Sequence, residues 1–499
     1  MSGIKQLAGQ TLWYGGSSIV ARLINYLLTP LLTGLLTVAD YGEMSMVYSF
    51  IPFMNIIFTY GMETAFFRFV QNNDKKEVYN TSSMSLIITS VFLSILLVLF
   101  RHPIASLLKV EAHPEYITLS ALIIGFDALS TIPFAKLRLD GKPRKFAFIK
   151  IVGIIVNFIC VYVFLGVLPK LLDKNPHHWI GTFYHKEWAV GYVFVANLFQ
   201  SIVTLLFLSR ELLGFKLKID KALWKTMILY GIPLILAGFA GMINETFDRI
   251  MLGWWAPAAT EEAAKVQVGI YSACYKLSIL ITLAVQAFRM GAEPFFFKQS
   301  TSENATRTYA RVMKFFVITI CIMFLTVVLY LDIWKQFIRN PKMWVGLKVV
   351  PILLLANMFV GIYYNLSIWY KLGNKTIAGA YITLIGAAVT IIINYLFVPH
   401  YSYMACAWAT FLAYGSMMVV SYVWGQKEYR VPYAWKKLCA YIIIAVIIYF
   451  MHHWLIAKIS GTWFNYGLAT ALLLIYTVFI LRVEKNEFQR LPVIGKYLK

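Results

Sequence analysis

Long apolar runs follow one another along almost the whole chain, separated by short polar segments. Fourteen runs of about 20 residues have their centres near residues 22, 54, 90, 126, 158, 199, 235, 279, 321, 357, 387, 413, 446 and 472. A helix of about 20 apolar residues is long enough to cross the hydrocarbon core of a bilayer. The pattern therefore predicts an all-α polytopic membrane protein with about 14 transmembrane helices.

The composition agrees with this prediction. Of the 499 residues, 60% are hydrophobic and 14% are charged, whereas soluble domains carry about 25% charged residues. The formal net charge of +22 lies mainly in the polar segments between the apolar runs, so we attribute it to membrane topology and expect no nucleic-acid partner. Five cysteines without paired spacing are predicted to be packing residues: Cys160, Cys274, Cys321, Cys406 and Cys439.

The distribution of basic residues predicts the orientation. Fourteen crossings place both termini on the same side. If the N-terminus is cytoplasmic, the inner segments hold 30 of the 45 Lys and Arg residues and the outer loops hold 12, as the positive-inside rule requires. The other three, Arg22, Lys150 and Lys276, lie within apolar runs. We therefore expect a multi-pass protein of the bacterial cytoplasmic (inner) membrane with both termini cytoplasmic.

The two halves of the chain show weak internal similarity. Tyr14-Gly15 opens the first helix as Tyr230-Gly231 opens the seventh, and Phe66-Phe67-Arg68 ends the second as Phe296-Phe297-Lys298 ends the eighth. The matches predict six-helix lobes at 1–215 and 216–428, followed by two additional helices and a tail at 429–499. Six spans per lobe make the repeats parallel, an arrangement that places a substrate site between rocking lobes.

Several short motifs carry a resemblance to a known family. They are Gly231 and Pro233, Asp248-Arg249 followed by Leu252-Gly253, Gly269-Ile270-Tyr271, and the loop from Leu137-Arg138 through Lys142, Lys145, Phe146 and Ala147. Over nearly its whole length the chain resembles the polysaccharide transporters, the oligosaccharide (O-antigen) flippases of the multidrug, oligosaccharidyl-lipid and polysaccharide exporter superfamily.

The resemblance implies a function. Such a flippase moves undecaprenyl-diphosphate-linked oligosaccharide from the inner to the outer leaflet by alternating access, for surface polysaccharide (lipopolysaccharide, O-antigen) biosynthesis. The expected partners are this polyprenyl diphosphate sugar and membrane lipids, with polysaccharide assembly proteins as further candidates and a monomer as the working form. No cofactor is expected.

Arg22 is the first candidate for substrate binding. An ionised residue at mid-membrane costs about 2.5–3.5 kcal/mol on insertion scales and usually faces a cavity. Ser18, Arg22 and Asn25 recur at helical spacing and share one face. This polar face suits an anionic pyrophosphate and hydroxyl-rich sugars, because the guanidinium matches phosphate geometry. Alternatively, Arg22 pairs with a carboxylate such as Asp127 and only fixes the packing.

Five further positions complete the candidate set. Lys276 lies within the eighth apolar run and either binds substrate or snorkels to the outer face. Asp248 and Arg249, near the outer end of the seventh helix, are predicted to form a gate or a helix-end ion pair. Asp127 and Glu63 are candidates for ion pairs or gating, and Lys150 is given no role because it is close enough to the cytoplasmic helix end to snorkel.

Two other functions are alternatives. A multidrug or cation antiporter of the same fold would need acidic and aromatic residues in its cleft, and the cationic balance argues against it. A membrane glycosyltransferase or polysaccharide polymerase needs paired carboxylates or a large outer loop, whereas the first outer loop spans only about Thr37 to Glu43. No hydrolase, phosphate-loop or metalloprotease motif occurs, and no carboxylate completes a metal site around His177, His178 and His185. We therefore expect neither an enzyme nor a metal site.

Overall fold

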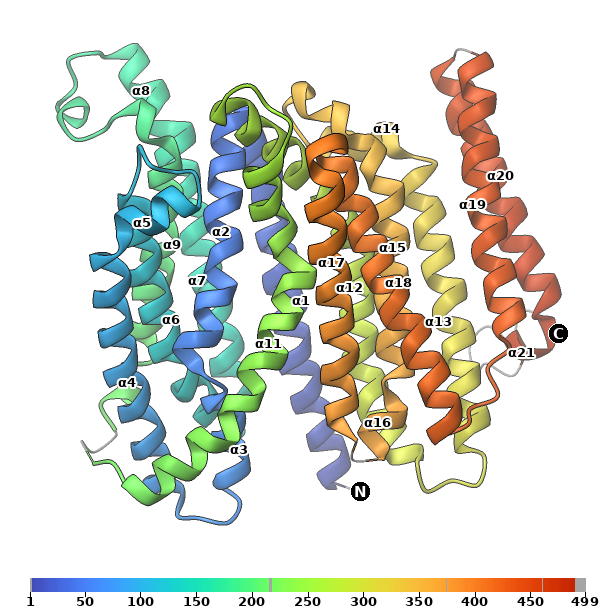
Figure 1. Ribbon diagram of the computed structural model, residues 1–499, viewed down its shortest axis with the longest axis horizontal. Helices are drawn as coiled ribbons and strands as arrows, with labels where there is room; N and C mark the ends of the chain where they lie inside the picture. The colour runs from blue at the N-terminus through green and yellow to red at the C-terminus, as the bar shows by residue number, and fades with distance from the viewer. Residues whose placement is uncertain (1, 215–217, 374, 460, 490–499) are drawn as a thin grey trace. The chain divides into compact units, whose positions relative to one another are not determined.

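The computed structural model describes residues 2–214, 218–373, 375–459 and 461–489, and these form helices joined by short connections (Figure 1). The first half contains α1 (Ser2–Leu35), α2 (Val38–Thr59), α3 (Met62–Phe69), α4 (Lys75–Leu99), α5 (Arg101–Leu107), α6 (Glu115–Leu139), α7 (Pro143–Val161), the π-helical η1 (Tyr162–Val167), α8 (Leu168–Lys174), the 3₁₀ turns η2 (Trp179–Thr182) and η3 (Lys186–Trp188), α9 (Ala189–Phe207), α10 (Ser209–Leu212) and α11 (Lys221–Trp255).

The second half is also helical. It contains α12 (Glu261–Gln299), α13 (Ala305–Val328), α14 (Leu331–Trp334), the 3₁₀ turns η4 (Lys335–Phe337) and η5 (Pro341–Val349), α15 (Val350–Leu366), α16 (Ile368–Leu372), α17 (Thr376–Tyr401), α18 (Tyr403–Glu428), α19 (Trp435–Lys458), α20 (Thr462–Val483) and α21 (Lys485–Phe488). The described residues include no strand, so the predicted all-α fold is confirmed.

Twelve helical segments of the described chain are long and apolar enough to cross a membrane, and a shorter apolar stretch, Ile19–Leu35, lies in α1. Helix α2 has 22 residues but carries Asp40, Glu43 and Asn55, and it is not among the twelve. These twelve segments, α1 and α2 correspond to the fourteen predicted runs. The chain is a multi-pass membrane protein.

The start of α2 differs from the expected outer loop at 37–43. Thr37 caps the helix, because its hydroxyl accepts a hydrogen bond from the Asp40 backbone N–H at 3.1 Å and the Asp40 carboxylate accepts from the Thr37 N–H. This reciprocal capping satisfies N–H groups that a helix end otherwise leaves without partners. Gly42 and Glu43 are therefore helical residues in the first two turns of α2.

Helix α2 ends at a sharp break before α3. Tyr60 and Gly61 have φ values of 33° and 72°, in the left-handed region that favours glycine. The break packs against α11, where a Cβ on Gly231 would lie 2.4 Å from the Tyr60 carbonyl oxygen. Two residues later Pro233 lacks a backbone N–H and interrupts the ladder of α11. Figure 1 shows α11 changing direction along its length.

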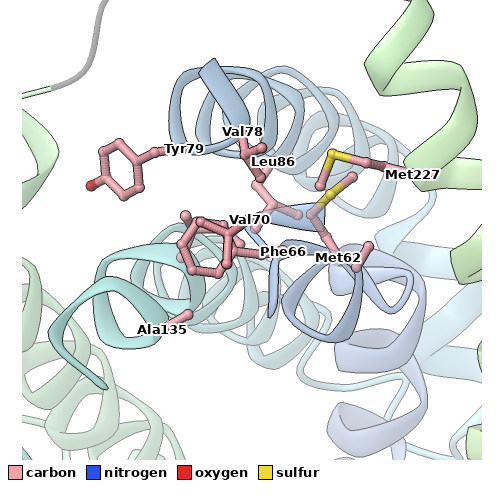
Figure 2. Packing of buried hydrophobic residues seen from close by; sticks show 10 residues of the cluster. Met62, Phe66, Val70, Val78, Tyr79, Leu86, Ala135 and Met227 are labelled. Atoms are coloured by element: carbon pink, nitrogen blue, oxygen red, sulfur yellow. The ribbon is translucent and has the colours of Figure 1, made fainter. Parts of the chain in front are cut away.

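A buried cluster fixes α3 among its neighbours (Figure 2). Met62 and Phe66 of α3 pack with Val78 and Leu86 of α4, with Ala135 of α6 and with Met227 of α11. Lipid tails are as apolar as these side chains, so the hydrophobic effect does not drive helices together within a membrane. The cluster stabilises the helix contact through close van der Waals packing. The cluster holds the ends of α3, α6 and α11 together.

The helices form two compact units. Unit 1 consists of Met1–Lys276, Ile338–Gly346 and Thr383–Ala413, and unit 2 consists of Leu277–Phe337, Leu347–Ile382 and Tyr414–Lys499. Helices α12, α17 and α18 contribute residues to both units. The predicted lobe boundaries at 215/216 and 428/429 stay a prediction.

Within unit 2, a buried carboxylate joins α19, α20 and α13. Glu484, which is 3% exposed, accepts hydrogen bonds from Lys437 at 2.7 Å, Lys314 at 3.0 Å and the Tyr441 hydroxyl at 2.5 Å. Glu484 lies one residue beyond the apolar span of α20. Burial raises its pKa, but the hydrogen bonds from Lys437, Tyr441 and Lys314 outweigh burial and hold the pKa below the ordinary value of 4.5.

Candidate functional site: two cationic clusters within the spans

Arg22 lies on the accessible side of α1. Arg22 and Asn25 are both exposed, whereas Thr29, further along the helix, is 3% exposed. Helix α1 packs mainly against α7. Ser18, the third member of the predicted polar face, lies in α1 but outside the residues whose side chains are described. Arg22 and Asn25 therefore share the exposed side of α1.

Asp127 lies on α6 and accepts a hydrogen bond from a residue of α9. The hydroxyl of buried Ser201 donates a hydrogen bond to Asp127 Oδ1 at 2.8 Å. The cation that acts electrostatically on Asp127 is Lys150 of α7, and the same ammonium also interacts with Arg22. We call Arg22, Asp127, Lys150 and Ser201 the first cluster. Its two cations and one carboxylate leave it with a net positive charge.

Lys150, to which the sequence assigned no role, is an exposed residue beside two aromatic rings, and its snorkelling to the cytoplasmic end stays a prediction. It is the eighth residue of α7, about 10 Å from the helix start at 1.5 Å per residue, and its Nζ lies 5.1 Å from the ring centroid of Phe134 and 5.5 Å from that of Phe146. These aromatic contacts hold the ammonium among α6 and α7. Phe146 and Lys150 are four residues apart in the sequence, a spacing that predicts contact between two side chains on one helix.

The second cluster joins α11 to α12. Arg249 Nη1 lies 3.0 Å from Asp248 Oδ1, and the Tyr271 hydroxyl donates to Asp248 Oδ2 at 2.5 Å. The guanidinium lies 4.2 Å from the ring centroid of Tyr275. The side chains of Arg249 and Asp248 are 12% and 4% exposed, so this is a largely desolvated ion pair with aromatic walls.

Lys276 completes the second cluster, which we define as Asp248, Arg249, Tyr271, Tyr275 and Lys276. Its ammonium interacts electrostatically with Arg249, and no carboxylate of the described residues forms an ion pair with it. Asp248 is already shared between Arg249 and Tyr271. The second cluster therefore also carries a net positive charge, on half-buried Lys276.

Two tyrosines connect α1 and α2 to the second cluster. Tyr26 follows Arg22 by one turn of α1 and is 8% exposed, and Tyr41 of α2 is 1% exposed. Tyr41 interacts electrostatically with both Tyr26 and Arg249. Within unit 1, phenol groups on α1 and α2 thus lie near the guanidinium of the second cluster.

The family model for polysaccharide biosynthesis proteins matches residues 7–300, which is more than half of the chain. The chain belongs to this family. The match includes every residue of both clusters. No curated protein sequence matches the chain significantly.

Solved structures show the fold of this polysaccharide biosynthesis protein. It is similar to the lipid II flippase MurJ in an inward closed conformation, with a TM-score of 0.68, 14% identity, and coverage of 94% of this chain and 98% of that one. It is also similar to an inward-facing multidrug resistance MATE family transporter of the MOP superfamily, with a TM-score of 0.59, 14% identity, and coverage of 85% and 93%. The chain therefore has a MurJ- and MATE-like fold.

Glu63 belongs to neither cluster of this family member. Its carboxylate forms an ion pair with Arg138 of α6, whose guanidinium also lies 5.0 Å from the ring centroid of Phe67. The pair joins α3 to α6. The gating role considered for Glu63 stays a prediction, as do the roles of Asp127, Asp248 and Arg249.

A metal site is not found among the side chains that the structure describes: no group of three or more His, Cys, Asp or Glu residues is placed to hold an ion. His178 instead caps η2, because its Nδ1 accepts a hydrogen bond from the Ile180 N–H at 3.3 Å.

Proposed function

We propose that this protein is a flippase that carries undecaprenyl-diphosphate-linked oligosaccharide from the inner to the outer leaflet of the bacterial cytoplasmic membrane. The observation that carries the proposal is the net positive charge of both clusters, which lie on transmembrane helices, where ionised groups are retained for function. The family description and the similarity to a lipid II flippase support it.

The two clusters would divide the recognition of the head group. Arg22 and Lys150 face the anion from the first predicted lobe, and Arg249 and Lys276 face it from the second. A guanidinium can hold a phosphate with two parallel hydrogen bonds, whereas an ammonium acts as a point charge. Asn25 and the tyrosine hydroxyls supply neutral contacts for sugar hydroxyls.

The electrical term favours export of such a substrate. The cell interior is negative, so an anion moving outward gains about 2.3 kcal/mol per charge per 100 mV, or about 4–5 kcal/mol for a diphosphate. The cations must bind strongly enough to desolvate the head group and weakly enough to release it. Rocking of the two predicted lobes around the bound anion would expose it to each side in turn.

Replacement of Arg22 tests the proposal. We expect Arg22→Ala to reduce surface polysaccharide display and Arg22→Glu to abolish it, because the second change opposes the diphosphate. Display is measured by labelling of surface glycan, and membrane insertion by the amount of protein in the membrane fraction. Lys174→Ala, at an exposed position of α8, is the matched control and should leave display unchanged.

Full display by correctly inserted Arg22→Glu protein would refute the assignment of Arg22 to the substrate. The phenotype of a null mutant distinguishes a flippase from the enzyme alternatives. A flippase null accumulates lipid-linked units on the cytoplasmic side, whereas a polymerase null leaves single units outside. We propose that the protein carries out no chemical step itself.

A further inference from the structure

Helices α2 and α12 touch through their backbones at a pair of glycines. A Cβ built on Gly42 would lie 1.9 Å from the Lys265 carbonyl oxygen and 2.9 Å from the Gly269 backbone nitrogen. A Cβ on Gly269 would lie 2.1 Å from the Val38 carbonyl oxygen. No side chain fits at either position, because the obstructing atoms are backbone atoms that cannot rotate away. Only glycine allows this approach.

An ion pair flanks the glycine contact. Lys265 Nζ lies 3.2 Å from Glu43 Oε2, and the side chains of Glu43 and Lys265 are 10% and 16% exposed. Glu43 Oε1 has no hydrogen-bond partner among the described residues. A buried pair of this kind is strongly destabilised when one partner is removed, because the other charge is left uncompensated.

Two weaker contacts lie on the same predicted outer side. The Arg339 backbone N–H donates to the Thr33 hydroxyl at 3.1 Å, which joins the end of α1 to the segment before η5. Lys109 pairs with Glu261 at 3.0 Å and joins the α5–α6 connection to the start of α12. Each contact connects a residue of the first predicted lobe to a residue of the second.

The division of helices between the units agrees with these contacts. Helices α12, α17 and α18 are each divided between the two units. In each of them the predicted outer part belongs to unit 1, together with the first predicted lobe. These parts are residues 261–276, 383–401 and 403–413. The predicted inner parts of the same helices belong to unit 2. The predicted outer parts of these three helices are thus assigned to the same compact unit as the first lobe, whereas α13 and α15 belong wholly to unit 2.

We propose that Gly42, Glu43, Lys265 and Gly269 form an outer lock, which holds the outward exit closed and must open once in each transport cycle. The proposal rests on the proposed function, because alternating access requires the outer ends of the lobes to separate. Two features of the contact allow it to open. Backbones in contact at glycine part without disentangling side chains, and both charged groups can be hydrated when water enters.

Reversible cross-linking tests the lock. Glu43→Cys and Lys265→Cys are combined in a protein with Cys160 and Cys439 replaced by Ser, because these two cysteines are the ones that are not buried. The protein is reconstituted in vesicles containing a fluorescent undecaprenyl-diphosphate N-acetylglucosamine, and a short reducible bifunctional thiol reagent is added. We expect cross-linking to stop movement of the probe and reduction to restore it.

A second cysteine pair controls for the reagent. Asp173→Cys with Lys186→Cys replaces an exposed ion pair within the first predicted lobe, and its cross-link should leave movement unchanged. Failure of Glu43→Cys/Lys265→Cys to cross-link, or unchanged movement after cross-linking, would overturn the lock. Absence of movement by the native protein would instead count against the proposed function with this probe.

Glycine variants provide a readout that needs no transport. Gly42→Ala should lower the yield of the Glu43→Cys/Lys265→Cys cross-link several-fold, because the methyl group forces α2 and α12 apart. Gly241→Ala is the matched control, since a Cβ on Gly241 has no neighbour within 4 Å, and it should leave the yield unchanged. Equal yields in the two variants would contradict the backbone contact on which the lock depends.

Discussion

At the scale of single residues, the molecule shows how charges are retained within spans. Lys150 lies among two phenylalanine rings and acts on both Asp127 and Arg22. Asp127 is in turn held by Ser201 at 2.8 Å. Each charge therefore has an oriented neighbour, which reduces the penalty of placing it in a membrane. The first cluster contains two cations and one carboxylate, and the proposed function assigns this excess of positive charge to the substrate.

Lys150 should contribute to substrate affinity. Replacing it with Met removes one charge-assisted contact to the diphosphate, worth about tenfold in apparent affinity after partial screening by solvent. The measurement is the half-saturating concentration of the lipid-linked probe in vesicles. Lys150→Arg should retain most of the affinity, and Lys142→Met, at an exposed position outside both clusters, should retain all of it. An unchanged affinity in Lys150→Met would limit this lysine to a structural role.

At the scale of helices, the breaks in α2–α3 and α11 meet at one place. Gly231 lies against the Tyr60 carbonyl oxygen, where a Cβ would approach to 2.4 Å, and Pro233 follows within the same turn. Tyr60 also bonds to the Ser85 hydroxyl at 2.6 Å, and that hydroxyl accepts from Trp224 Nε1 at 2.7 Å. The junction therefore fixes α2, α4 and α11 relative to one another near their predicted cytoplasmic ends.

Gly231→Ala should destabilise this junction. Within a helix, alanine is normally more favourable than glycine by about 1 kcal/mol, so a loss of stability would show that the contact with Tyr60 outweighs helix propensity. We expect a lower Tm for detergent-solubilised Gly231→Ala and an unchanged or higher Tm for Gly241→Ala. The opposite order would show that α11 moves away from Tyr60 without cost.

The sequence predicts helices better than it predicts contacts between them, for a physical reason. Burial in lipid requires a continuous apolar run, so the spans can be read locally, even for α2 with its Asp40 and Glu43. The approach of Gly42 to Gly269 joins residues that are distant in sequence and depends on backbone geometry. The rings of Phe134 and Phe146 beside Lys150 could not be predicted as a pair, because distance from a helix end carries no information about neighbouring helices. The ion pair of Asp248 with Arg249 could be predicted from the sequence, because the two residues are adjacent.

At the scale of the whole molecule, charged groups attach the C-terminal helices to α13 within unit 2. Glu484 joins Lys314 of α13 to Lys437 and Tyr441 of α19, and Glu487 of α21 adds an ion pair to Arg311 at 2.9 Å. Glu484 and Glu487 lie beyond the end of α20, and Lys314 is the tenth residue of α13. Attachment of the two additional helices thus depends on the ionised state of a carboxylate.

Acid should weaken this attachment. Because the folded-state pKa of Glu484 lies below 4.5, its carboxylate contributes stability above that value, and the contribution is lost as the pH falls through the folded pKa. Glu484→Gln should lower the Tm at pH 7 by several degrees, since breaking a buried ion pair costs about 3–5 kcal/mol.

The Tm of Glu484→Gln should also change less than that of the native protein between pH 7 and pH 4. Exposed Glu262→Gln serves as the control and should follow the native protein at both pH values. If native protein and Glu484→Gln lost the same number of degrees on acidification, the acid sensitivity would have to arise from other carboxylates.

The glycine contact between α2 and α12 has a consequence for the genetics of the protein. Every amino-acid substitution at Gly42 or Gly269 adds at least a Cβ, and the atoms that it meets are the carbonyl oxygens of Lys265 and Val38. All twenty amino acids carry the same backbone carbonyl oxygen. No substitution of residue 265 or 38 can therefore make room for the added Cβ. Intragenic suppressors of Gly42→Ala should therefore map away from the facing residues, to positions that set the spacing of the two helices.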